Sequence, residues 1–253
     1  MADLTLDRPG TSEGDRLGRL EDAVSRLAAE NARLVLQVGR LEDAAAVRKL
    51  QHSYGYFMDK GLYNEVVDLF ADDGELRFMG GVFKGKEGVR RLYVGRLKPG
   101  FTGKNGPAFG MLADHLQLQD VIDVAEDRKT ARSRCRGFLQ GGSHDLKPDK
   151  NPHLPRQWWE AGIYENEYVN DAGVWKVKVM NYNLTWQGDF ETGWAHQPPY
   201  EGAFWKKTFP EDPLGPDEVT GEQTPFWPDT GRPALPLPPP GHRQADPAGV
   251  ARA

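Results

Sequence analysis

The chain of 253 residues contains 32 basic and 37 acidic side chains, which gives a formal net charge of −5 at pH 7. That length allows one large domain or two small ones, and the charge balance excludes the basic surface needed to bind nucleic acid or an anionic membrane. A single cysteine, Cys135, excludes an internal disulfide, and no apolar run is long enough to span a membrane. We therefore expect a cytoplasmic protein without nucleic-acid or membrane partners.

The N-terminal region combines a polar stretch with a heptad repeat. Residues 1–16 are polar and are predicted to be disordered. Over residues 17–41, one heptad position holds Leu20, Leu27, Leu34 and Leu41, and the other holds Leu17, Val24, Asn31 and Val38. Four repeats predict a coiled-coil helix, and a buried asparagine fixes the register of such a helix. The alternative is a long helix packed on its own domain, whereas DNA binding is disfavoured because no basic helix precedes the repeat.

Residues 43–97 predict three helices and a strand in close succession. Val47, Leu50 and Tyr54 recur at helical spacing, and Gly61 ends the first helix. A short second helix, a strand and a third helix follow. Asp59 falls in the last turn of the first helix, where the helix dipole disfavours a carboxylate. Its presence there indicates a specific role.

The second half of the domain is predicted to be a sheet. Strand-like runs occur at residues 112–126, 130–140, 157–170 and 174–187, and most are joined by short turns. Sequential strands of this kind predict a curved antiparallel sheet packed on helices, which is an α+β cone with a cavity between its layers. Residues 191–253 are rich in proline and aromatic residues. The aromatic residues predict an ordered arm on the cone or on a neighbouring subunit.

The order of these elements, with the phrases Met58-Asp59-Lys60-Gly61 and Leu69-Phe70-Ala71-Asp72-Asp73-Gly74, resembles the nuclear transport factor 2-like superfamily. Within it the chain is similar to the SnoaL-like and scytalone dehydratase-like branch over residues 42–190. The resemblance implies a cone-shaped pocket, chemistry without a cofactor, and a homo-oligomer. We expect a dimer or trimer that assembles through residues 17–41 and the faces of the sheet.

The resemblance also implies three catalytic residues. Asp59 matches the family's aspartate at the end of the first helix, and His115 matches one of its two catalytic histidines. Tyr164 stands where the family has an inward asparagine, and a phenol there can donate a hydrogen bond. The chain departs from the family's pattern at Met58, Leu139 and Gly162. Half of the dehydratase set is therefore replaced, and the alternative role for Asp59 and His115 is structural hydrogen bonding.

Strand alternation adds candidates for substrate binding. Trp158, Glu160 and Tyr164 share one face of residues 157–170. In the last strand the lysines are expected to face water, which directs Asn181 into the cavity unless a bulge intervenes. The remaining candidates are Tyr54, Tyr56 and Arg134. At most one of these two tyrosines can face the cavity, and arginines in such a pattern more often line a solvated face. The histidines are too scattered to predict a metal site.

An apolar pocket that holds a general acid or base and hydrogen-bond donors suits elimination, isomerisation and retro-aldol cleavage. We predict a cofactor-independent lyase that acts on a hydroxylated aromatic substrate. The long aromatic arm is similar to that of bacterial SnoaL-like proteins of aromatic catabolism, which implies release of formaldehyde from a lignin-derived diarylpropane to give a stilbene. The alternatives are a dehydratase or isomerase of a phenolic substrate, and a non-catalytic binding protein or a partner resembling an oxygenase small subunit.

Overall fold

The computed structural model describes residues 12–148, 155–198, 204–220 and 226–229. The chain divides into two compact units, Met1–Asp43 and Ala44–Ala253. Helix α1, Glu13–Asp59, supplies residues to both units. None of the described helices is both long enough and apolar enough to span a membrane.

Helix α1 begins at a capping box. The backbone N–H of Asp15 donates to Oγ of Ser12, and the Asp15 carboxylate accepts from the backbone N–H and the hydroxyl of Ser12. The helix therefore begins within the stretch predicted to be disordered, while residues 1–11 lie outside the described residues. It continues without a break to Asp59, and Gly61 follows with a φ of +61°, the left-handed conformation that favours glycine at a helix end.

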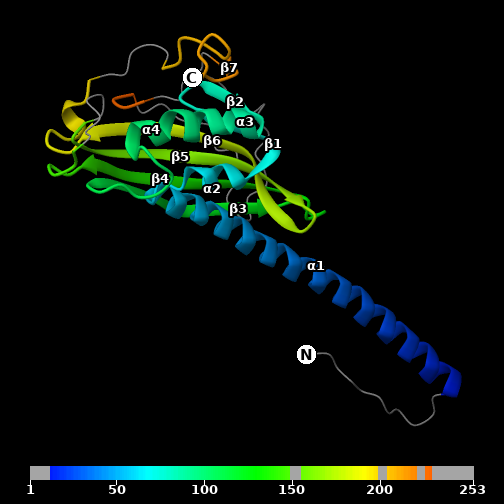
Figure 1. Cartoon of the computed structure of the whole chain (residues 1–253). Helices are drawn as coiled ribbons and strands as arrows, with labels where there is room; N and C mark the ends of the chain where they lie inside the picture. Colours follow the sequence, from blue (N-terminus) through cyan, green and yellow to red (C-terminus); the bar gives the residue numbers. More distant parts are fainter. Residues whose placement is uncertain (1–11, 149–154, 199–203, 221–225, 230–253) are drawn as a thin grey trace, which may run out of the picture. The chain divides into compact units, whose positions relative to one another are not determined.

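The second unit contains a seven-stranded sheet in the order β3-β4-β5-β6-β1-β2-β7. Its strands are β1 Phe70–Phe78, β2 Gly81–Lys84, β3 Met111–Val124, β4 Thr130–Ser143, β5 Gln157–Asp171, β6 Val174–Asp189 and β7 Glu218–Val219. The four long strands β3 to β6 run side by side, and each pairs antiparallel with the next (Figure 1). These are the four strands predicted from the sequence. β1 pairs with β6 in parallel, which the sequence did not indicate.

Short helices complete the α+β fold that was predicted. They are α2 Tyr63–Asp68, α3 Gly85–Arg90, the π-helical segment η1 Arg91–Leu97, and α4 Lys98–Phe101. The C-terminal part of α1, together with α2 and η1, packs on the sheet around a shared apolar core. The helices contribute Val47, Val66, Val67 and Leu92, and the strands contribute Phe70 and Met180. A 3-10 turn, η2 Trp194–His196, follows β6.

A bulge in β6 changes which side chains face the core. Tyr168 and Glu167 are neighbours on β5, whereas their partners on β6, Val177 and Val179, are separated by one residue. An extra residue reverses the alternation of a strand. Val177 is buried before the bulge, and Met180 and Tyr182 are buried after it. Asn181 therefore lies on the opposite face of the sheet from the core, which corrects its predicted place in the cavity.

The described parts of the C-terminal arm pack on the sheet of their own chain. Trp205 is buried, and its indole N–H donates to the carbonyl oxygen of Phe78 over 2.8 Å. β7 pairs with β2, and the backbone N–H of Trp227 donates to the carbonyl oxygen of Thr185 over 2.9 Å. The arm is therefore hydrogen-bonded to β1, β2 and β6.

Candidate functional site

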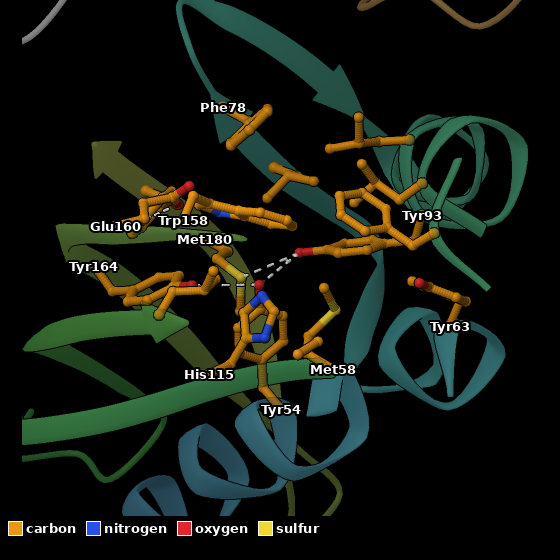
Figure 2. Close-up of a pocket in the computed structure, with 17 residues that line it drawn as sticks. Tyr54, Met58, Tyr63, Phe78, Tyr93, His115, Trp158, Glu160, Tyr164 and Met180 are labelled. Atoms are coloured by element: carbon orange, nitrogen blue, oxygen red, sulfur yellow. Dashed lines mark hydrogen bonds between the residues drawn. The ribbon is translucent and has the colours of Figure 1, made fainter. Parts of the chain in front are cut away.

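An apolar cavity of about 120 Å³ lies inside the second unit (Figure 2). Its walls come from α1, α2, η1, α4 and strands β1 and β3 to β6, and its polar side chains are Tyr54, Tyr63, Tyr93, His115, Glu160, Tyr164 and Tyr182. An apolar cavity of about 150 Å³ is known to hold benzene. The space here suits roughly one aromatic ring.

Three tyrosine hydroxyls meet in the cavity wall. Tyr54 accepts hydrogen bonds from Tyr93 over 3.2 Å and from Tyr164 over 3.4 Å. Figure 2 shows both hydroxyls directed at that of Tyr54. Burial raises the pKa of all three phenols, so they stay protonated. Since Tyr54 accepts both hydrogen bonds, its own O–H can donate to an oxygen atom of a ligand.

Glu160 brings a carboxyl group into this apolar cavity. Burial raises its pKa to about 7, and a hydrogen bond from the Tyr182 hydroxyl to Oε1, over 2.9 Å, opposes that rise. Gly162 makes room for the Tyr182 ring, because a Cβ at that position would lie 2.5 Å from it. A carboxyl group with such a pKa is part protonated at neutral pH. It can therefore both donate and accept a proton.

His115 presents a neutral imidazole. Its Nδ1 is buried and makes no hydrogen bond to any residue that the structure describes. Burial lowers the pKa of His115 to about 3. Gly55 lets α1 approach β3 closely here, since a Cβ on it would lie 2.6 Å from the carbonyl oxygen of His115. The ring of His115 lines the cavity, so a ligand there can hydrogen-bond to its neutral imidazole.

Asp59 holds the backbone of His115 rather than its ring. Oδ1 of Asp59 accepts from the backbone N–H of His115 over 2.6 Å, whereas the distance from Oδ1 to Nδ1 is 3.9 Å, too long for a hydrogen bond. Burial raises the pKa of Asp59. Asp59 is absent from the residues that line the cavity. Its geometry is that of a positioning residue.

Five of the nine predicted site residues line the cavity, namely Tyr54, His115, Trp158, Glu160 and Tyr164. The other four do not line the cavity. One of them is Asp59, and the remaining three lie elsewhere. Tyr56 is 72% exposed. Arg134 forms an ion pair with Glu165 on the opposite face of the sheet, because the small residues that alternate with it face inward. Asn181 lies on that same face, beyond the bulge in β6.

Sequence reasoning missed several lining residues. Tyr182 and Met180 were missed because the bulge reverses the faces of β6. Tyr93 lies in η1, whose π-helical turn departs from the 3.6-residue period used to read helices. Its proximity to the buried Val89 and Leu92 was the available signal for a core-facing residue.

Comparison with known proteins agrees with this fold. A model of the SnoaL-like domain matches residues 39–181. None of the curated proteins compared with the chain matches it. The solved structure of LinA is 20% identical, with a TM-score of 0.50 and coverage of 65% of this chain and 99% of that one.

Two further solved structures show similar coverage. A hexachlorocyclohexane dehydrochlorinase, LinA-type3 from Novosphingobium barchaimii LL02, is 19% identical, with a TM-score of 0.49 and coverage of 64% of this chain and 99% of that one. A protein of Novosphingobium aromaticivorans DSM 12444, designated a candidate scytalone dehydratase, is 17% identical, with a TM-score of 0.49 and coverage of 68% and 99%. At these identities the likeness concerns the fold alone.

Proposed function

Since the chain belongs to the SnoaL-like domain family, we propose that it is a lyase that acts on a hydroxylated aromatic substrate without a bound cofactor. The observation that carries the proposal is Glu160, a carboxyl group whose pKa of about 7 suits proton transfer, in a cavity that is also lined by the neutral imidazole of His115. A group of this kind can protonate a leaving hydroxyl group.

The lining of the cavity is suited to binding a phenol ring. Phe78, Trp158 and Tyr182 supply aromatic wall, and offset or edge-on contacts between such rings favour an aromatic guest. The phenol oxygen of the substrate accepts from Tyr54 and donates to the neutral imidazole of His115. Because the imidazole is neutral, it can take the phenol proton while the ring becomes a quinone methide.

The chemistry divides into two steps, each with one proton transfer at Glu160 and one at His115. In the first, protonated Glu160 gives its proton to the benzylic hydroxyl group, the C–O bond breaks and water leaves, while the phenol proton moves to His115. In the second, the Glu160 carboxylate removes the proton of the terminal hydroxymethyl group and the C–C bond breaks to release formaldehyde. The electron pair returns to the ring, and its oxygen recovers the proton from His115. The lowered pKa of His115 favours that return.

The overall reaction converts a diarylpropane diol into a stilbene, one water and one formaldehyde, and both protein groups regain their starting protonation. The cavity has room for about one ring. We therefore place the reacting phenol inside it and the second aryl group outside. A substrate without the hydroxymethyl group would stop after the loss of water, which is the dehydratase version of the same site.

The test uses a matched pair of diols without added cofactor. One carries a 4-hydroxyphenyl ring next to the benzylic hydroxyl group, and the other carries a 4-methoxyphenyl ring, which cannot give a neutral quinone methide. We expect stilbene and formaldehyde in equal amounts from the first diol and none from the second. Formation of an alkene without formaldehyde would contradict C–C cleavage and support the dehydratase version of the site. Binding of both diols without any product would overturn the proposal in favour of a non-catalytic binding protein.

A further inference from the structure

We propose that residues 16–42 of α1 pair with the same residues of a second copy of the chain as a parallel, in-register, two-stranded coiled coil. The starting observation is an exposed apolar stripe within the first unit. Every described residue from Ser12 to Val38 is exposed except Ala23, which is partly exposed. The exposed fraction reaches 58% for Leu17, 70% for Leu27 and 68% for Leu41.

Such a stripe calls for a partner helix. Most helices in proteins are stabilised by packing of an apolar face rather than by intrinsic propensity. The stripe on α1 repeats every seven residues, the period that lets two helices supercoil while keeping one seam in contact. A second copy presents the same stripe at the same spacing, so it matches along the whole length.

The residues of the seam select two parallel strands. The four d positions of the heptad hold Leu20, Leu27, Leu34 and Leu41. Two of the four a positions, Val24 and Val38, are β-branched, and this combination favours parallel dimers. Asn31 occupies a third a position and is exposed in the single chain. In a parallel pair in register, Asn31 meets the Asn31 of the other copy and the two amides can hydrogen-bond. In an antiparallel pair it would face a leucine and lose that bond.

The flanking charges agree with this register. In a parallel pair each g residue faces the e residue five positions later on the other copy. Arg16 therefore faces Glu21, an attractive pair that occurs twice by symmetry. The remaining g and e pairs contain no two like charges, and they are Ala23 with Ala28, Glu30 with Val35, and Gln37 with Glu42.

Disulfide trapping tests the pairing in the full-length chain. The parent protein is the first control, because its single cysteine, Cys135, is buried. Val24→Cys, in the seam, is expected to give a covalent dimer under mild oxidation. Ala29→Cys, on the opposite side of the helix, is the matched control and should give little. Absence of a Val24→Cys dimer, or equal trapping at both positions, would overturn the proposal, since an antiparallel pair keeps the two Val24 residues apart.

A charge exchange supplies the second measurement. Arg16→Glu places two glutamates opposite each other, and sedimentation of residues 1–253 should show association weakened by roughly tenfold. The double variant Arg16→Glu/Glu21→Arg restores opposite charges and should recover the parent's association. A double variant as weak as the single one would contradict the parallel register, whichever other surfaces hold copies together.

Discussion

The hydroxyl group of Tyr182 donates a hydrogen bond to Oε1 of Glu160 over 2.9 Å. A hydrogen bond to the carboxylate stabilises the ionised form, so it lowers the pKa that burial raises. In the proposed mechanism the protonated form of Glu160 begins the reaction. We therefore expect kcat/KM to fall as the pH rises above about 7, the pKa of Glu160.

The variant Tyr182→Phe tests that assignment. Removal of the hydroxyl leaves the Glu160 carboxylate less stable, so its pKa should rise and the fall in kcat/KM should move to higher pH. The pH profile of both proteins with the same hydroxylated diol measures the midpoint. A midpoint that stays in place, or moves to lower pH, would show that another group controls the profile.

Glu160 and His115 also predict opposite effects of pH on stability. The folded chain keeps a proton on Glu160 up to about pH 7, whereas the unfolded chain loses it near 4.5, so this group stabilises the fold at low pH and the stabilisation is lost as the pH rises. His115 takes up a proton near pH 6.5 when unfolded but only near 3 when folded. Its contribution is present above pH 6.5 and is lost as the pH falls.

The two contributions largely cancel between pH 5 and 7 in the parent protein. In Glu160→Gln only that of His115 remains, and the free energy of unfolding should increase from pH 5 to 7 by about 2 kcal/mol more than in the parent. In His115→Gln the free energy of unfolding should decrease from pH 5 to 7 by about 2 kcal/mol relative to the parent. Urea unfolding at the two pH values measures both differences, and differences of the same sign would contradict the opposite pKa shifts.

Asp59 is expected to act through the backbone of His115. Asparagine at this position keeps an oxygen that can accept the backbone N–H, so Asp59→Asn should retain most of the activity. Asp59→Ala removes the acceptor, and we expect a loss of about 1–3 kcal/mol in stability together with lower kcat. If Asp59→Asn were as inactive as Asp59→Ala while folding normally, the carboxylate itself would take part in proton transfer.

The buried tryptophan of the arm contributes to the fold around the cavity. Trp205 contacts the Phe83 ring and donates to the carbonyl oxygen of Phe78, a cavity residue. Trp205→Ala should lower the free energy of unfolding by about 3–5 kcal/mol. Trp227→Ala is the comparison, because Trp227 is only partly buried and its loss should cost less. Equal losses in urea unfolding would show that burial of Trp205 is unimportant.

Strand patterns predicted much of the fold and part of the site. The alternation of β5 identifies Trp158, Glu160 and Tyr164 correctly as sharing the inner face, because β5 pairs with β4 without a break and both register shifts against β6 insert their extra residue in β6. Along β6 the residue inserted between Val177 and Val179 reverses the faces, so Asn181 and Tyr182 exchange places. Nothing in the local composition of β6 marks that insertion.

The chemical roles were harder to predict than the positions. Glu160 was expected to bind substrate, and its raised pKa depends on burial and on Tyr182, a neighbour that comes from another strand. Asp59 and His115 do meet, but through a backbone N–H, which no residue pattern reveals. The family resemblance identified both residues as catalytic, whereas the atoms in contact depend on how α1 packs against β3.

Turnover of the 4-hydroxyphenyl diol by three forms of the protein tests the role of Glu160 most directly. Glu167→Gln is the matched control, since Glu167 lies on the same strand, is exposed and pairs with Arg132. We expect the parent and Glu167→Gln to release stilbene at the same rate, and Glu160→Gln to bind the diol but to react at least about 100-fold more slowly. Normal turnover by Glu160→Gln would contradict the proposed mechanism.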